Sequence, residues 1–124
     1  MKKTINIIIM SVALFGVASC TPPKTLESGS QKTETTIKEQ IQKGAFVVDV
    51  RTPEEYADGS VQGAVNIPLN EVQSRIKEFE GKPSVIVFCR SGNRSSQAIK
   101  ILESNGITNV TNGINVATME KEMK

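Results

Sequence analysis

The stretch that decides the fold reads Ser84-Val85-Ile86-Val87-Phe88-Cys89-Arg90-Ser91-Gly92-Asn93-Arg94-Ser95-Ser96-Gln97-Ala98-Ile99-Lys100-Ile101-Leu102. Its apolar, largely β-branched first part predicts a buried strand that ends on Cys89. A short polar loop with one glycine follows, and the apolar spacing of the last part predicts a helix. A buried strand followed closely by a helix is typical of α/β domains.

Cys89 thus lies where a strand meets the start of a helix. The helix start offers a positive dipole end and unpaired backbone N–H groups, and Arg90 and Arg94 flank the cysteine. Each feature stabilises a thiolate relative to a thiol. The pattern predicts a nucleophilic cysteine in a pocket that accepts anions. The alternative is a structural cysteine buried at a strand end.

Further apolar segments alternate between strand and helix patterns along the chain. The predicted strands are Phe46–Val50, Ala64–Ile67, Val85–Phe88 and Asn109–Thr111. The predicted helices are Ile37–Lys43, one that starts at Thr52-Pro53-Glu54-Glu55, Asn70–Phe79, Ser95–Ser104 and a terminal helix or turn over Ile114–Lys124. This alternation predicts a mostly parallel sheet, whose ligand site lies beyond the carboxyl ends of the strands. Cys89, Asp49 and Arg51 are all predicted at such ends.

The beginning of the chain has the pattern of a targeting segment. Two lysines precede an apolar run over Ile5–Val17, which is too short to span a bilayer. The run closes with Val17-Ala18-Ser19-Cys20, which resembles a bacterial lipobox and implies cleavage before Cys20 and acylation of that residue. An ordinary secretory signal and an uncleaved anchor are the alternatives. We therefore expect a signal peptide over 1–19, a polar tether over 20–35 and a domain over 36–124.

Composition restricts the possible functions. The 124-residue chain has 15 basic and 13 acidic side chains, and the expected leader removes two lysines, so the remainder has no net charge and no nucleic-acid partner is expected. The absence of histidine excludes Ser–His and Cys–His catalysis and disfavours zinc. Of the two cysteines, an acylated Cys20 leaves Cys89 as the free thiol. We expect neither a metal nor a cofactor.

Three motifs carry a resemblance to a known family. They are Asp49-Val50-Arg51-Thr52-Pro53-Glu54-Glu55-Tyr56, Gly59-Ser60-Val61-Gln62-Gly63-Ala64-Val65-Asn66-Ile67-Pro68-Leu69 and Cys89-Arg90-Ser91-Gly92-Asn93-Arg94-Ser95. From about Thr36 to Met119 the chain resembles a single-domain rhodanese. The resemblance implies a mostly parallel sheet of about five strands with helices on both faces. The chain departs from the family pattern in two places. Gly59-Ser60 replaces the common Gly-His, and Asn112-Gly113-Ile114-Asn115-Val116-Ala117 replaces the closing Gly-Gly-x-x-x-Trp.

The resemblance also implies a reaction. Cys89 would accept a sulfane sulfur from thiosulfate or a persulfide and pass it to cyanide, a small thiol or a protein thiol, by ping-pong chemistry. The substrate-binding loop would comprise Arg90, Ser91, Gly92, Asn93, Arg94 and Ser95, with Asp49 and Arg51 in support. The expected protein is a monomeric lipoprotein of the bacterial envelope, palmitate-bearing and held at the periplasmic face of the outer membrane.

Alternatives remain open at this level. A persulfide carrier would hold sulfur without turnover, and an inactive scaffold would use neither thiol nor loop. Arsenate reductases and phosphatases of related fold place five residues between cysteine and arginine, whereas four separate Cys89 from Arg94. The alternative for Arg94 is an ion pair with Glu54 or Glu55. The alternative for Arg51 is an ion pair with an acid that braces the loop after the strand. Asp49 is equally well explained by a structural role in orienting the loop. The alternative for Arg90 is simple exposure to solvent without a role in selecting the substrate.

Overall fold

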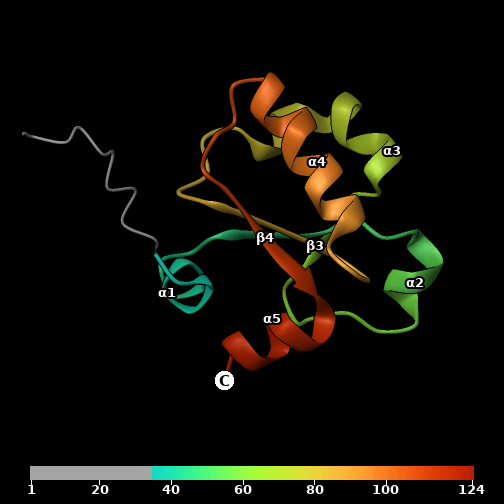
Figure 1. The fold of residues 1–124 in the computed structure, drawn as a ribbon, viewed down its shortest axis with the longest axis vertical. Helices are drawn as coiled ribbons and strands as arrows, with labels where there is room; N and C mark the ends of the chain where they lie inside the picture. Colours follow the sequence, from blue (N-terminus) through green and yellow to red (C-terminus); the bar gives the residue numbers. More distant parts are fainter. Residues whose placement is uncertain (1–34) are drawn as a thin grey trace, which may run out of the picture. The chain divides into compact units, whose positions relative to one another are not determined.

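Four parallel strands form the central sheet in the computed structural model, which describes residues 35–124 (Figure 1). They are β1 (Phe46–Asp49), β2 (Val65–Asn66), β3 (Val85–Cys89) and β4 (Val110–Asn115), in the spatial order β2-β1-β3-β4. The expected α/β class and parallel sheet are confirmed, with four strands in the described part where about five were expected. The predictions for the leader and Cys20 lie outside the described residues.

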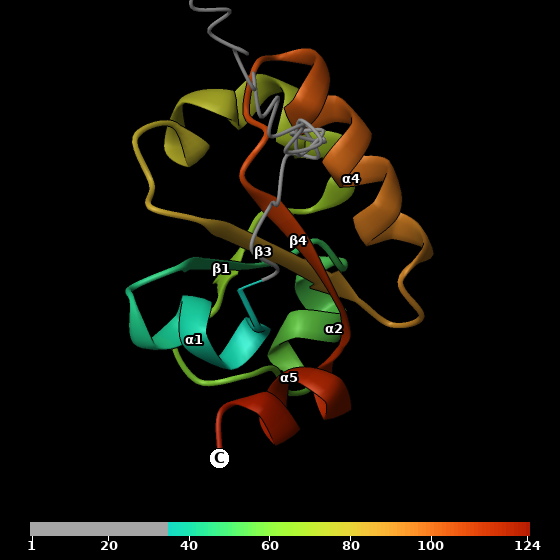
Figure 2. The ribbon, with the colours of Figure 1, turned by 60° about the vertical axis from the view of Figure 1, so that its left-hand side comes forward.

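Helices cover both faces of this sheet (Figure 2). They are α1 (Ile37–Gln42), α2 (Pro53–Ala57), α3 (Leu69–Val72), the 3-10 helix η1 (Gln73–Phe79), α4 (Asn93–Ser104) and α5 (Val116–Glu122). Helices α3, η1 and α4 pack on one face and α1 and α5 on the other, so the apolar core has two parts. No helix within residues 35–124 is long and apolar enough to cross a membrane.

Strand β3 lies between β1 and β4 and is buried on both faces. Val85, Val87 and Cys89 belong to the core beneath α4, while Ile86 and Phe88 belong to the core beneath α5. This alternation is the period of a strand, and burial on both sides explains why its sequence is continuously apolar. It directs the Cys89 side chain toward the α4 side of the sheet.

The predicted helix over Asn70–Phe79 was wrong as a single element. The chain forms the short helix α3 and then a 3-10 helix, with Arg75 at non-helical angles (φ −114°, ψ 23°). The Ser74 hydroxyl donates to the Glu71 carbonyl oxygen (2.9 Å), and a bond of this kind competes with the backbone ladder of an α-helix.

The elements around the cysteine also differ in their bounds from the prediction. Helix α4 begins at Asn93, two residues before the predicted start, with Gly92 as its N-cap. Strand β4 continues to Asn115 through a bulge at Gly113, because Val87 pairs with Asn112 and Phe88 with Ile114. A β-carbon at Gly113 would lie 2.5 Å from the Met119 sulfur, so a side chain at this position would force the buried Met119 to move. The predicted terminal helix therefore begins at Val116.

Candidate active site

The Cys89 sulfur is enclosed by the turn that follows it. The backbone N–H of Gly92 donates to Sγ at 3.1 Å, and the Ser95 hydroxyl lies 3.6 Å from Sγ. Gly92 has φ 89°, a left-handed angle that glycine adopts without steric cost, and this turns the chain back over the sulfur before α4 begins. Cys89 and Ser95 are both fully buried. The strand end and the helix start thus meet around one sulfur atom.

Burial alone raises the pKa of the Cys89 thiol, because it disfavours the charged thiolate. Hydrogen bonds from the Ser95 backbone and hydroxyl, and from the Ser91 and Gly92 backbones, outweigh this effect and lower the pKa to about 7. A large fraction of the sulfur is therefore thiolate at neutral pH, without a histidine base. A thiol of this acidity has the property that the sequence analysis expects of a nucleophilic Cys89.

The outer side of the turn is held by β4. The Gly92 carbonyl oxygen accepts from the Ser96 hydroxyl (2.7 Å) and from Nδ2 of Asn112 (3.2 Å), and the Ser95 hydroxyl oxygen lies 3.0 Å from it. The Asn112 side chain also accepts from Ser95, at 2.7 Å from its Oδ1. Sequence reasoning missed Asn112 as a site residue. The signal that could have found it is the departure from the family pattern, where glycine is replaced by a side chain able to form hydrogen bonds.

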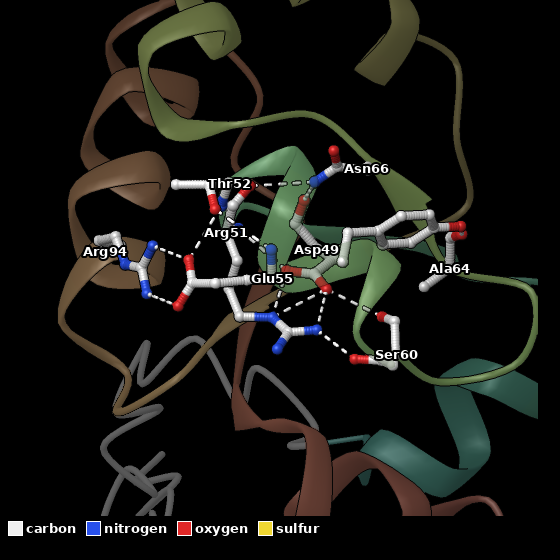
Figure 3. Close-up of polar contacts among 10 residues, drawn as sticks. Asp49, Arg51, Thr52, Glu55, Ser60, Ala64, Asn66 and Arg94 are labelled. Carbon is white, nitrogen blue, oxygen red and sulfur yellow. Dashed lines mark hydrogen bonds and ion pairs between the residues drawn. The ribbon is translucent and has the colours of Figure 1, made fainter.

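Arg94 is directed at α2 rather than over the turn (Figure 3). Its guanidinium donates two hydrogen bonds to the Glu55 carboxylate, at 2.6 and 2.9 Å. Glu55 also forms the capping box of α2 with Thr52. The Arg94 hydrogen bonds, followed by the bond from the Thr52 backbone, lower the pKa of Glu55 to about 2, so the pair is charged throughout the physiological range. The structure therefore adopts the pairing that the sequence offered as the alternative to anion binding.

The remaining loop residues lie at the surface. Ser91 and Asn93 are exposed, and Asn93 accepts a hydrogen bond from Gln97 on the next turn of α4. Arg90 is exposed and forms no salt bridge with any acid among residues 35–124. Since Arg94 is neutralised by Glu55, Arg90 supplies the uncompensated positive charge of the turn.

Asp49 and Arg51 form a buried brace at the end of β1 (Figure 3). Asp49 is fully buried and Arg51 is 11% exposed; the guanidinium contacts both carboxylate oxygens, with a shortest distance of 2.6 Å. The hydrogen bond with Asp49 raises the pKa of Arg51. Ser60 donates to the same carboxylate (2.8 Å), and Arg51 donates to the Gly59 carbonyl (2.7 Å). The brace thus fixes the Gly59-Ser60 loop, where the sequence departs from the family pattern.

The arrangement provides one nucleophile, several N–H and O–H donors and one free cation. This combination suits attack on an electrophile that bears negative charge. No group of three His, Cys, Asp or Glu side chains that could hold a metal ion occurs within residues 35–124.

Comparisons with known proteins point to one family. Residues 33–115 match the family model described as "Rhodanese-like domain". The Escherichia coli protein "Thiosulfate sulfurtransferase PspE" is 46% identical over 52% of this chain and 64% of its own length. The Bacillus subtilis protein "Putative sulfur carrier protein YrkF" is 33% identical over 77% of this chain and 48% of its own length. The chain thus spans about half to two thirds of these curated relatives.

Solved structures of similar fold point to the same family. A solved structure titled "rhodanese with anions from E. coli" matches with a TM-score of 0.56 and 41% identity, over 60% of this chain and 89% of that one.

Proposed function

The chain belongs to the rhodanese-like domain family, and we propose that it moves a sulfane sulfur from thiosulfate or a persulfide to a thiophilic acceptor through a persulfide on Cys89. One observation carries this proposal. The Cys89 sulfur lies at the start of α4, receives the Gly92 N–H at 3.1 Å and has its pKa lowered to about 7. The thiosulfate sulfurtransferase named among the relatives supports the same reaction class.

The first half-reaction forms the persulfide. The Cys89 thiolate attacks the outer sulfur of thiosulfate, a new S–S bond forms, and the old S–S bond breaks with its electron pair leaving on sulfite. N–H donors of the turn, including that of Gly92, stabilise the anionic outer sulfur of the enzyme persulfide. Arg90 attracts the anionic donor to the exposed side of the turn.

The second half-reaction releases the sulfur. A nucleophile such as cyanide or a thiolate attacks the outer sulfur of the persulfide, and the S–S bond breaks with its electron pair returning to Cys89. The thiolate is then regenerated without net oxidation. The solved relative titled as a rhodanese with anions supports anionic substrates for this pocket. The four-residue spacing between Cys89 and Arg94 continues to favour sulfur over the larger phosphate or arsenate centres.

Thiocyanate formation from thiosulfate and cyanide is the experiment that tests the proposal. The full chain carrying Cys20→Ser has Cys89 as its single thiol, and it should turn over. Its activity can then be assigned to Cys89. The same chain carrying Cys89→Ser in addition should form no thiocyanate above the uncatalysed background. A phosphate-ester substrate serves as the control for the alternative chemistry. Turnover of the ester, with none of thiosulfate, would overturn the sulfur assignment.

A non-turnover persulfide carrier is the second candidate, favoured by similarity to a protein named as a sulfur carrier. Intact-protein mass spectrometry after thiosulfate treatment separates the two. Both functions predict a mass gain of one sulfur atom on Cys89. When cyanide is added, a carrier yields at most one equivalent of thiocyanate and does not turn over. A sulfurtransferase releases the sulfur and turns over repeatedly.

We propose further that the protein is held at the envelope by acylation of Cys20, on the basis of the lipobox-like Val17-Ala18-Ser19-Cys20. The test is fractionation of cells that express the full chain. The parent should partition with the outer membrane and carry a diacylglyceryl mass at Cys20, while Cys20→Ser should lose both properties. A soluble parent with an unmodified Cys20 would refute the anchor.

A further inference from the structure

The Ser95 hydroxyl has one proton and three acceptors within reach. Asn112 Oδ1 lies at 2.7 Å from the hydroxyl oxygen, the Gly92 carbonyl oxygen at 3.0 Å and the Cys89 sulfur at 3.6 Å. Only one of these acceptors can receive the proton at a time. The shortest contact assigns it to Asn112, which leaves the hydroxyl oxygen as an acceptor toward a protonated Cys89 thiol.

Ionisation of Cys89 changes this balance. A thiolate is a charged acceptor, and a hydrogen bond to a charged group is stronger than one between neutral groups. The hydroxyl must leave Asn112 in order to donate to the sulfur. Asn112 Oδ1 does not become unsatisfied when this happens, because the backbone N–H of Ile114 already donates to it at 2.9 Å. The hydroxyl can thus rotate between two satisfied arrangements.

The Asn112 amide is itself fixed by its other end. Nδ2 donates to the Gly92 carbonyl (3.2 Å) and to the Ser96 hydroxyl (3.0 Å), so its oxygen must face Ser95 and Ile114. The assignment of oxygen and nitrogen follows from these four contacts together. The amide oxygen of Asn112 is therefore already oriented to accept the Ser95 proton. Asn112 lies at the position where the family pattern has glycine.

We propose that Asn112 is a positioning residue of the site: its amide oxygen competes with the Cys89 sulfur for the single hydroxyl proton of Ser95. The inference rests on Cys89 as the nucleophile of the proposed function. It adds a residue of β4 to a site otherwise built from the turn after β3. While Cys89 is a thiol, Asn112 holds the Ser95 proton, and this lowers the fraction of Cys89 that is ionised. Once the sulfur is charged, the Ser95 hydroxyl turns from Asn112 to the thiolate.

The charged groups near the sulfur would not account for a change in Cys89 ionisation when Asn112 is replaced. Arg90 and Arg94 come from the turn and α4, and Arg94 is paired with Glu55 of α2. The buried pair of Asp49 and Arg51 lies at the end of β1. Strand β4 contributes no titratable side chain. Replacing Asn112 by alanine leaves all of these charges in place. A change in the ionisation of Cys89 would therefore reflect the hydrogen bond that the Ser95 hydroxyl donates.

The test is the rate of iodoacetamide alkylation against pH, measured on the full chain with Cys20→Ser. Asn112→Ala should shift the midpoint of the profile downward by roughly half to one pH unit, because the thiolate then competes for the Ser95 proton with the more distant Gly92 carbonyl alone. Asn112→Asp should shift the midpoint upward, because a carboxylate holds the proton more strongly and adds negative charge. A midpoint that rises or stays constant in Asn112→Ala would overturn the proposal. An unchanged or lower midpoint in Asn112→Asp would also overturn the proposal. This second variant decides the question if Asn112→Ala does not fold.

A double-mutant cycle separates positioning from a merely structural role. In the Ser95→Ala background, adding Asn112→Ala should no longer move the midpoint. Thr111→Val is the matched control, since Thr111 is the adjacent β4 residue and its hydroxyl bonds to Gln40 rather than to the turn. It should lower thermal stability without moving the midpoint. A downward shift that persists without the Ser95 hydroxyl would refute the mechanism. Alkylation needs no sulfur donor, so this result is independent of sulfur transfer.

Discussion

Arg94 and Glu55 join the helix that begins at the cysteine turn to the first turn of α2. Two hydrogen bonds of 2.6 and 2.9 Å connect the side chains, which are 30% and 26% exposed. The pKa of Arg94 is raised mainly by Glu55 and to a smaller extent by the charge of Cys89, so Arg94 lies near the cysteine. Its positive charge is nevertheless neutralised by Glu55. The cysteine turn has two arginines in its sequence, and of these only Arg90 lacks an acidic partner in a salt bridge among residues 35–124.

Glu55→Gln should strengthen the binding of anionic sulfur donors. The substitution releases the Arg94 charge, and about 1 kcal/mol of added attraction would lower the KM for thiosulfate roughly 5-fold. Glu54→Gln is the matched control, because it removes the same charge from the neighbouring position without releasing Arg94. Steady-state kinetics of both variants decide the matter. Equal KM changes would assign the effect to net charge alone.

The same pair gives a pH dependence of stability with a defined sign. The pKa of Glu55 is lowered to about 2 from an ordinary value near 4.3. Its contribution to stability is therefore complete above about pH 4.3 and is lost as the pH falls through 2. Urea unfolding of the parent and of Glu55→Gln should differ at pH 7 and converge toward pH 2. A difference that persists unchanged at pH 2 would contradict the assignment.

Cys89 should react as a thiol with a pKa of about 7. Its alkylation rate should rise with pH, reach half its maximum near pH 7 and level off above pH 8, whereas an ordinary cysteine has its midpoint near 8.5. Because the folded pKa is the lower one, ionisation stabilises the fold above about pH 8.5, and this contribution is lost as the pH falls through 7. A midpoint above 8 would contradict the observed donor set. Cys89→Ser gives the background rate.

Asp49→Ala should be the most destabilising substitution among the ion pairs. It leaves the 11%-exposed Arg51 without its buried partner, and such losses cost about 3–5 kcal/mol. Glu71→Ala, which breaks an exposed pair with Arg75, should cost at most about 1 kcal/mol. Urea denaturation measures both. Similar values for the two variants would mean that burial does not control the energy of the Asp49 brace.

Ile114→Gly should stabilise the protein although it deletes a large apolar side chain. Ile114 has φ 67°, the left-handed region that a β-branched residue adopts at a cost of about 1–2 kcal/mol, and it is 43% exposed. The entropic cost of glycine, roughly 0.5–1 kcal/mol, and the loss of the partly buried side chain leave a net gain of at most about 1 kcal/mol. Val65→Gly, at a similarly exposed apolar residue, should destabilise. Thermal unfolding of the two variants should move in opposite directions.

The sequence predicted those parts of the fold whose local patterns agree with their tertiary setting. The continuous apolar run into Cys89 became a strand buried on both faces, and Thr52-Pro53-Glu54-Glu55 became a capped helix with Pro53 at its start. The kink at Arg75 and the bulge at Gly113 were not predicted. The bulge depends on space beside Met119, which belongs to another element and leaves no mark in the local pattern.

The candidate site was predictable to a similar extent. The nucleophile and its turn follow from residue types and order. The partner of Arg94 does not, because Glu54 and Glu55 are equally near in sequence and only the orientation of α2 selects Glu55. Ser60 and Asn112 were noticed as departures from a pattern, and only the fold shows that both departures place hydrogen-bonding groups at the site.

The support that β4 gives to the cysteine turn has a consequence for how a newly made chain behaves. Asn112 follows Gly92 by 20 residues, so synthesis produces the nucleophile before the strand that completes its surroundings. The donors that lower the Cys89 pKa belong to the turn and to the start of α4, which are both made before β4. The amide oxygen proposed to compete for the Ser95 proton is therefore made last. A nascent chain in which the turn has formed without β4 should hold a more acidic thiol than the finished protein.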